Sequence, residues 1–272
     1  MPELPEVETV VRSLRPRVIG QSIKAVWQSG KPLRLATPLD VVLLKKVCAK
    51  ALITAVRRRG KYLLVDLDRG CVLVHLGMSG QLRLQEESGE RPAHTHVAFR
   101  LSNGQELRFV DPRRFGWVEA CGVGGAFAQI ADLGPDPLEE LSVAQLRELL
   151  SESKASIKSV LLDQRKIAGL GNIYVCEALH AAKIHPAVSA DRAVGKAALL
   201  FKTIQAALRT GLENRGTSLR DYVDADGRPG TNSTALKVYG REGLPCLSCG
   251  TAIARRTDGG RSSFYCPRCQ LG

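Results

Sequence analysis

The chain has 272 residues, 44% of them hydrophobic, and a formal net charge of +12. A chain of this length is too long for one ordinary hydrophobic core and predicts two domains plus a small appended module. The hydrophobic content is typical of a globular protein. Such a large positive charge indicates an acidic binding partner, because an enzyme without one would gain nothing from the repulsion between its own charges. We expect this partner to be nucleic acid, with an anionic membrane surface as the second candidate.

The start of the chain and its apolar runs carry no targeting signal. The first eight residues, from Met1 to Glu8, are acidic and interrupted by proline, unlike a secretory signal. The apolar runs are strand-sized, well short of a membrane span. We therefore expect a cytoplasmic protein that neither spans nor binds a membrane. In that reducing compartment four scattered cysteines are expected to be small buried residues rather than disulfide partners: Cys48, Cys71, Cys121 and Cys176.

The first half of the chain predicts a mostly antiparallel β domain. An amphipathic helix over Glu6–Leu14 precedes it. Between Ile23 and Glu119, short Val- and Leu-rich runs alternate with turn residues. The runs are 51–56, 62–67, 71–76, 81–84, 96–101 and 106–110.

The second half predicts a helical domain. A segment rich in proline and glycine, 132–138, marks a connection between domains, and we place the linker at 133–139. Ser142 and Gln145 form a capping-box pattern ahead of leucines at helical spacing. Further helices are expected at 156–162, from Asn172 onward and at 193–212.

The last part of the chain has the spacing of a structural zinc site. Two Cys-x2-Cys pairs are separated by sixteen residues, and the ligands are Cys246, Cys249, Cys266 and Cys269. Four protein ligands complete a tetrahedron and leave no open position, so this zinc organises the fold and does not catalyse. The residues between the pairs can form a hairpin, and their basic, glycine-rich stretch 255–261 suits close approach to a phosphate backbone.

Pro2 is a candidate nucleophile. It is small enough for the initiator methionine to be removed, which exposes a secondary amine that can form an iminium with a sugar carbon. An α-amino group titrates at about 8 in model peptides, so part of it is neutral at physiological pH. Taken alone, a proline at position 2 is usually only a second residue, and the surrounding motifs decide its role.

Six motifs follow one another along nearly the whole chain. They are Met1-Pro-Glu-Leu-Pro-Glu-Val-Glu-Thr9, Gly60-Lys-Tyr-Leu63, His75-Leu-Gly-Met-Ser-Gly80, Asp111-Pro-Arg-Arg-Phe-Gly116, Gly169-Leu-Gly-Asn-Ile-Tyr174 and the terminal cysteine pairs. Together they resemble the formamidopyrimidine-DNA glycosylase family of bacterial repair enzymes. Chance agreement of six separate motifs in this order is negligible.

The resemblance implies the activity and the architecture. The family removes oxidised purines such as 8-oxoguanine and formamidopyrimidines from duplex DNA, then cuts the strand by β,δ-elimination. Its α+β fold comprises an N-terminal antiparallel β-sandwich with flanking helices, a helix-two-turns-helix domain and a four-cysteine zinc hairpin. We accordingly expect a catalytic domain at 2–132, a DNA-binding helical domain at 140–240 and a zinc finger at 241–272. A monomer at the nucleoid is expected.

The resemblance also assigns the catalytic groups. Pro2 would attack C1′, Glu3 would transfer protons, and Glu6 would support the same cluster. An alternative for Glu3 and Glu6 is an acidic first helical turn that complements the helix dipole. Lys61 would act at the lesion phosphate and in β-elimination, while the role of 57–59 stays undecided. Arg261 would stabilise the leaving phosphate during δ-elimination electrostatically, because a guanidinium hardly loses its proton.

The remaining assignments concern DNA. An enzyme that flips out a base must fill the gap that the base leaves. The family does this with a three-residue wedge, which matches Met78, Arg113 and Phe115. For the two apolar residues of this wedge, packing in the core is the alternative. His94 and His75 would touch DNA. His94 and His96 are expected in a polar loop with no third metal ligand nearby. Asn172 would hold a phosphate, cap the following helix, or do both.

The sequence departs from the family pattern at two places, and two other functions are considered. Where many relatives carry an aromatic residue and glutamine, this chain has Thr231-Asn232-Ser233, in the loop expected to cover the flipped base. Arg220 replaces a common lysine and keeps the charge. The enzymatic rival is the endonuclease VIII branch, which prefers oxidised pyrimidines; Leu4 and the wedge residues favour the purine branch. The other rival is a catalytically silent protein that binds damaged DNA.

Overall fold

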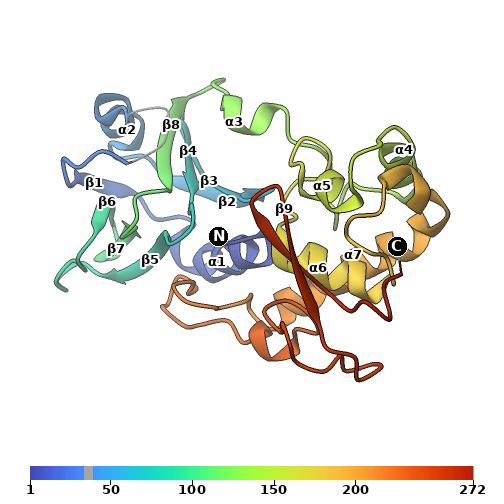
Figure 1. Cartoon of the computed structure of the whole chain (residues 1–272). Coiled ribbons are helices and arrows are strands. Elements are labelled where there is room, and N and C mark those ends of the chain that lie inside the picture. Colours follow the sequence, from blue (N-terminus) through green and yellow to red (C-terminus); the bar gives the residue numbers. More distant parts are fainter. Residues whose placement is uncertain (34–38, 272) are drawn as a thin grey trace. The chain divides into compact units, whose positions relative to one another are not determined.

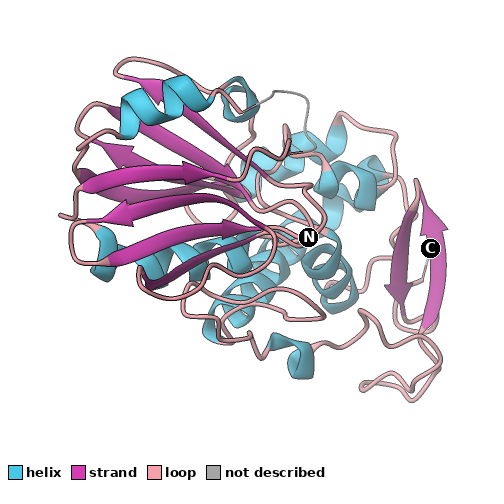
Figure 2. Ribbon diagram, turned by 90° about the vertical axis from the view of Figure 1, so that its left-hand side faces the viewer, coloured by secondary structure: helices cyan, strands magenta, loops and turns pink. Residues whose placement is uncertain are grey.

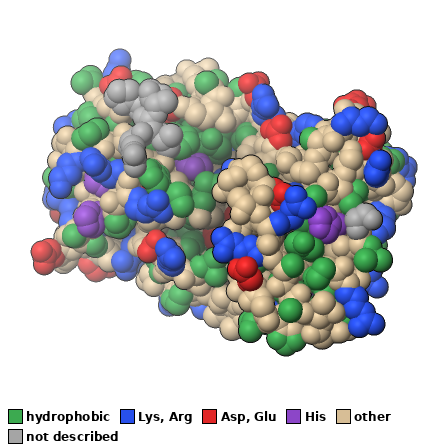
Figure 3. All heavy atoms as spheres, viewed as in Figure 1, with side chains coloured by type: hydrophobic (Ala, Val, Ile, Leu, Met, Phe, Trp, Pro, Cys, Tyr) green, Lys and Arg blue, Asp and Glu red, His purple; other side chains and the backbone are tan. Residues whose placement is uncertain are grey.

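The computed structural model describes residues 1–33 and 39–271 and divides the chain into two compact units. One unit comprises Met1–Ala131 with Asn214–Thr231, and the other comprises Asp132–Glu213 with Asn232–Gly272 (Figure 1). The first is built mainly of strands and the second mainly of helices, which confirms the predicted α+β class. On the face that Figure 3 shows, lysine and arginine side chains are scattered and do not gather in one patch.

Two four-stranded antiparallel sheets form the first unit (Figure 2). One sheet has the order β1 (Ile23–Gln28), β6 (Thr95–Leu101), β7 (Gln105–Val110) and β5 (Gln81–Glu86). The other has the order β2 (Ile53–Arg59), β3 (Tyr62–Leu67), β4 (Gly70–His75) and β8 (Trp117–Gly122). Apolar side chains from both sheets, including Ile23, Val65 and Phe99, line one internal space. The sheets therefore pack face to face, as the expected sandwich requires.

Three helices accompany the sandwich: α1 (Leu4–Val18), α2 (Val41–Cys48) and α3 (Ala128–Ala131). Helix α1 is longer than the predicted 6–14, because Pro5 lies in the first turn, where no backbone N–H is needed, and Pro16 lies near the end. Its valines and Leu14 are fully buried in the core. Helix α2 was not predicted; Asp40 caps it by accepting the Leu43 N–H at 2.8 Å.

The second unit consists of α4 (Val143–Ser151), α5 (Ile157–Leu162), α6 (Asn172–Ala181), η1 (Ala190–Lys196), α7 (Ala197–Glu213), η2 (Asn232–Ala235) and the hairpin β9 (Ala254–Asp258) and β10 (Arg261–Tyr265). The capping box of Ser142 and Gln145 is present. Helices α6 and α7 pack so closely that a Cβ at Gly211 would lie 2.5 Å from the Tyr174 hydroxyl. The predicted helix at 193–212 begins as a 3-10 helix and becomes an α-helix at Ala197.

Residues 214–231 differ from the expected domain layout. We expected them in the helical domain at 140–240, but they pack with the sandwich. Tyr222 and Ala225 belong to the sandwich core, and the Gln81 side chain donates to the Asp221 carbonyl at 2.6 Å. The segment belongs to this unit because its apolar side chains are buried in that core. The predicted linker also differs, since the Gly134 N–H is bonded within the second unit, to the Gln164 carbonyl at 2.9 Å.

The scattered cysteines follow the expectation in part. Cys48 and Cys176 are buried, whereas Cys71 and Cys121 are only partly buried and face each other across β4 and β8. None of the four forms a disulfide. Within 1–33 and 39–271, no helix has the length and apolar character needed to cross a membrane.

Candidate functional site

The N-terminus is a largely buried cluster of ionisable groups. Pro2 is buried, and Glu3 is only 3% exposed as the residue that precedes α1. Burial lowers the pKa of the Met1 amino group; the carboxylates of Glu3 and Glu6 oppose this shift, while Lys61 and Arg113 reinforce it. The charges of all four side chains act on this chain end. The structure therefore brings together the predicted nucleophile, acid and lysine.

Glu6 holds two backbone segments with its carboxylate. Its Oε2 accepts the N–H of Glu3 at 2.9 Å, and its Oε1 accepts the N–H of Thr217 at 2.6 Å. The hydroxyl of Tyr222 adds a second tie by donating to the Glu6 carbonyl, 3.1 Å away. Glu6 thus anchors the segment 214–231 to the first turn of α1. The dipole explanation alone does not account for these contacts.

Lys61 lies in the tight turn between β2 and β3 and is 6% exposed. The turn is held to α1 by Arg58, whose guanidinium pairs with Glu8 at 3.2 Å and donates to the Gly60 carbonyl. Arg57 instead pairs with Asp66 on the neighbouring strand. Arg57 and Arg58 therefore have structural partners, and Arg58 positions the turn that carries Lys61.

His75 is the last residue of β4 and stacks on Trp117 of β8, with ring centroids 4.3 Å apart. Burial, reinforced by the positive charges of Lys61 and the chain terminus, lowers the pKa of His75 to about 4. Its Nδ1 accepts the backbone N–H of Gly77 at 3.0 Å. An accepting Nδ1 carries no proton, so the neutral ring has its hydrogen on Nε2 and can donate it.

The predicted wedge residues lie on two turns that touch. Met78 is 45% exposed, so it does not serve as core filler. Gly77 has φ +61°, and a Cβ there would lie 2.4 Å from the Gly116 nitrogen, so only glycine permits this approach of the two turns. On the second turn the Arg113 guanidinium lies 4.6 Å from the ring centroid of Phe115. The structure therefore groups the three predicted residues at one place.

Asp111 joins these two turns and was not singled out from the sequence. It is fully buried, and its carboxylate accepts the Ser79 hydroxyl at 2.6 Å and the N–H groups of Arg113 and Gly116 at 3.2 and 2.8 Å. An aspartate immediately before a proline is an ordinary turn signal. Its bond to the other turn depends on the fold, and this is what makes it an organiser of the wedge.

The two neighbouring histidines separate. His94 is exposed, with a left-handed backbone at φ 65°. His96, which stands both in the predicted strand 96–101 and in the expected polar loop, lies in β6 and is 2% exposed; its Nε2 bonds the Asp111 carbonyl at 3.0 Å. The loop expectation is therefore wrong, and the buried, hydrogen-bonded ring makes His96 a core histidine.

Asn172 and Lys158 hold β10 close to the turn of the β9–β10 hairpin. Asn172 is the first residue of α6, whose N-cap is Gly171, so the capping role is not its own. Its amide donates to the Ser262 carbonyl at 2.8 Å, and the Lys158 ammonium donates to the same carbonyl at 2.9 Å and to the Ser263 hydroxyl at 2.7 Å. Lys158 is 2% exposed and was missed by sequence reasoning, because no local pattern distinguishes it.

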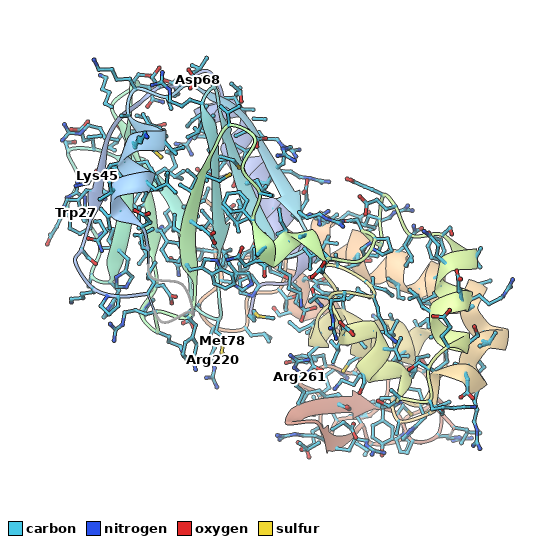
Figure 4. All side chains as sticks on the ribbon, turned by 90° about the horizontal axis from the view of Figure 1, so that it is seen from above. Trp27, Lys45, Asp68, Met78, Arg220 and Arg261 are labelled. Carbon is cyan, nitrogen blue, oxygen red and sulfur yellow. The ribbon has the colours of Figure 1, made fainter. Side chains whose placement is uncertain are left out.

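Arg261 follows directly on the hairpin turn. Gly259 and Gly260 both have positive φ, which suits a two-residue turn of the I′ type. The Arg261 side chain is exposed and projects from the hairpin end, and no salt bridge holds it within the described part of the chain (Figure 4). Arg261, Asn172 and the cysteine pairs belong to the second unit, whereas the other candidate residues belong to the first.

The four cysteines have the geometry of a zinc site. Their sulfur atoms all lie within 4.8 Å of one another, and the Cys246–Cys269 and Cys249–Cys266 pairs are 4.0 and 3.5 Å apart. Zinc–sulfur bonds of about 2.3 Å in a tetrahedron require sulfurs about 3.8 Å apart. Hydrogen bonds from Thr251 lower the pKa of Cys249 to about 6, while the Cys249 sulfur raises the pKa of Cys269 to about 12. Metal binding therefore displaces protons here.

Comparison with known proteins gives consistent matches along the chain. Residues 1–118 match the formamidopyrimidine-DNA glycosylase N-terminal domain, residues 133–223 its H2TH domain, and residues 243–271 the zinc finger found in FPG and IleRS. The formamidopyrimidine-DNA glycosylase of Rhizorhabdus wittichii is 47% identical over 99% of this chain and 100% of its own. That of Legionella pneumophila is 42% identical, over 99% and 98%.

Solved structures agree with these sequence matches. The Lactococcus lactis Fpg bound to DNA containing an abasic site has a TM-score of 0.91 and 35% identity, covering 99% of this chain and 100% of its own. A MutM complex with DNA containing carbocyclic 8-oxo-G has a TM-score of 0.90 and 35% identity, covering 100% of both chains.

Proposed function

The chain belongs to the formamidopyrimidine-DNA glycosylase family, and we propose that it excises oxidised purines from duplex DNA through an N-terminal proline nucleophile and then nicks the strand. The observation that carries the proposal is the cluster at the chain start, where Glu3 and Lys61 are buried and their charges, with that of Arg113, act on the N-terminal amine. Pro2 is itself buried beside Met1, so after Met1 is removed its amine lies in the same desolvated surroundings, which favour the unprotonated, nucleophilic form.

The chemistry begins once Met1 has been removed. The Pro2 nitrogen attacks C1′ of the damaged nucleotide as the C1′–base bond breaks and the base leaves. Glu3 protonates the ring oxygen O4′, the sugar ring opens, and a C1′=N iminium results. Loss of a C2′ proton then expels the 3′ phosphate, with Lys61 assisting the proton transfer, and a second elimination expels the 5′ phosphate. Arg261 stabilises the negative charge of the departing phosphate.

The remaining candidate residues contact DNA. The wedge of Met78, Arg113 and Phe115 fills the gap left by the flipped base, and Arg113 pairs with the orphaned cytosine. His75, His94 and Asn172 contact the phosphate backbone around the lesion. The four cysteines hold a structural zinc ion, which gives the β9–β10 hairpin a fixed shape. We expect the enzyme to work as a monomer on nucleoid DNA in the cytoplasm.

Borohydride trapping on a duplex with one 8-oxoguanine:C pair tests the nucleophile, because reduction of the iminium leaves a stable covalent adduct. The wild-type protein should form the adduct, and mass spectrometry should show that Met1 is absent. Pro2→Gly, which leaves a primary amine in place of the secondary one, should form much less of it, whereas Pro5→Ala, which alters the next proline but not the terminus, should form it at the wild-type level. Absence of a wild-type adduct, or an adduct with Pro2→Gly at the wild-type level, would overturn the mechanism.

Lesion choice needs its own comparison. The departure at Thr231-Asn232-Ser233 lies in the loop proposed to cover the flipped base, and Asn232 is 3% exposed. Cleavage of 8-oxoguanine:C and thymine-glycol duplexes should be measured side by side. Faster cleavage of thymine glycol would place the substrate range with the endonuclease VIII branch instead.

A further inference from the structure

Helix α6 presents two side chains, one turn apart, to the cysteine cluster. Cys176 packs in one apolar cluster with Val238, Cys246 and Cys266. His180, four residues later, shares the same helix face and is 8% exposed. Its Nε2 lies 3.7 Å from the sulfur of Cys246, which is itself 3% exposed. A buried imidazole therefore faces one of the four zinc ligands from outside the finger.

The contact lies between two well-anchored segments. The Glu177 carboxylate, one helical position from Cys176, accepts three consecutive backbone N–H groups at 2.8–3.0 Å, from residues 237 to 239. The Gln270 side chain donates to the Ile184 carbonyl and accepts the Cys266 N–H, both at 2.8 Å. These bonds attach the chain on both sides of the finger to α6 and the turn after it. The His180–Cys246 distance is therefore determined by more than the two side chains.

The charge of the site makes a donor valuable at this position. Four thiolates and one Zn²⁺ together carry two negative charges, and burying that charge requires hydrogen-bond donors around the sulfurs. The finger's backbone supplies some, since the N–H groups of Ser248 and Cys269 point at Cys246 and Cys266, with 3.5 and 3.4 Å between nitrogen and sulfur. A zinc-bound thiolate only accepts, so a ring nitrogen facing it is most favourable when it carries hydrogen.

We propose that His180 is a positioning residue of the zinc site, whose Nε2–H donates a hydrogen bond to the Cys246 thiolate and strengthens zinc binding. The inference rests on the zinc site of the proposed function and adds a residue from the helical domain to it. It also connects zinc to the DNA-binding part of the second unit. The helix that carries His180 begins at Asn172, whose amide holds the Ser262 carbonyl next to Arg261.

Zinc competition of the full-length protein against a chromophoric chelator tests this role with two substitutions. His180→Phe keeps a ring but removes the N–H, and His180→Gln keeps an N–H donor at a similar position. We expect His180→Phe to lose about 10- to 100-fold in zinc affinity, the usual effect of removing an outer-shell partner, and His180→Gln to remain near the wild type. His185→Phe is the control, because His185 packs on Tyr265 instead, with ring centroids 4.6 Å apart.

Cobalt substitution adds a spectroscopic measurement. The sulfur-to-metal charge-transfer absorption of the Co²⁺ protein should shift in His180→Phe and stay in place in His185→Phe. Wild-type affinity in His180→Phe, or equal weakening by Phe and Gln, would show that the ring only packs and would overturn the proposal. Borohydride trapping with zinc-saturated protein distinguishes a failure of this inference from a failure of the proposed function. If the wild type forms no adduct, the proposed nucleophile is wrong, but the zinc affinities still test the role of His180.

Discussion

The Glu6 carboxylate accepts the backbone N–H of Thr217 at 2.6 Å, which joins residues 211 positions apart in the chain. Its second oxygen accepts the Glu3 N–H, so each oxygen has its own donor. Glu6→Gln replaces one oxygen with an NH2 group that faces an N–H. We expect a loss of about 1–3 kcal/mol in the free energy of unfolding, the cost of leaving a buried donor without an acceptor.

Chemical denaturation measures this loss, with Glu139→Gln as the control because Glu139 is exposed. The control should stay within about 0.5 kcal/mol of the wild type. Equal stability of Glu6→Gln and the wild type would contradict the anchoring role of Glu6.

The buried His75 ring makes stability depend on pH. Because the pKa of His75 falls from 6.5 to about 4 on folding, only the unfolded chain takes up this proton between those values. The stabilisation from the neutral His75 ring is therefore fully present above pH 6.5. As the pH falls toward 4, the free energy of unfolding decreases by up to about 3 kcal/mol. His75→Asn, which keeps an acceptor for the Gly77 N–H, should flatten that part of the pH profile. His94→Asn at an exposed site should not.

Met78 should matter for excision and not for stability. Its side chain is 45% exposed, so Met78→Ala should change the free energy of unfolding by less than about 0.5 kcal/mol. If the side chain fills the gap left by the flipped base, single-turnover excision of 8-oxoguanine should fall by about tenfold, or about 1.4 kcal/mol of transition-state stabilisation. Val42→Ala, at a site that is 79% exposed, is the matched control. A destabilised Met78→Ala protein would favour core packing instead.

Zinc should be required for DNA binding but not for the integrity of the amine at Pro2. Cys246→Ser removes one of four ligands, so we expect loss of zinc, of DNA binding and of borohydride trapping together. Zinc affinity of the wild type should fall as the pH is lowered, because bound thiolates must lose the protons that the free thiols hold. Full excision activity in the zinc-free protein would refute the role given to the finger.

Arg261 should contribute one phosphate contact. DNA affinity should fall steeply with salt, because each phosphate contact releases counterions. Arg261→Ala should weaken binding and reduce the slope of log K against log salt by about 1. Arg69→Ala is the control; Arg69 precedes β4, at the opposite end of that strand from His75, and should leave the slope unchanged. An unchanged slope for Arg261→Ala would remove Arg261 from the phosphate contacts.

Local patterns were enough for much of the fold. The strand at 62–67 and the capping box at Ser142 were predicted at the observed residues, because alternation and capping involve near neighbours. Helix α2 was missed because it begins with four consecutive apolar residues, 41–44, and periodicity alone cannot assign such a run to a helix or a strand. His96 was expected both in the strand 96–101 and in a polar loop; the strand is confirmed, and the loop was wrong because the ring lies in the core.

The candidate site also contains some residues that the sequence predicted and others that only the structure revealed. The motifs nominated Pro2, Glu3, Lys61 and the wedge, and the structure groups them in the first unit. Sequence reasoning did not single out Asp111, whose bond to Ser79 crosses 32 residues, or Lys158, whose bond to Ser263 crosses 105. Such contacts leave no periodic or motif signal, because either partner is an ordinary polar residue until the fold brings the other to it.

The sequence by itself determined two things about this protein: its ordered motifs nominated Pro2, and it contains two cysteine pairs spaced for zinc. Both depend on covalent order and short spacing, which need no knowledge of packing. Only the tertiary structure decided that Glu6 holds Thr217, that 214–231 joins the sandwich, and that His180 faces Cys246. Burial of distant apolar segments brings these partners together, and once buried, their polar groups must find donors and acceptors there.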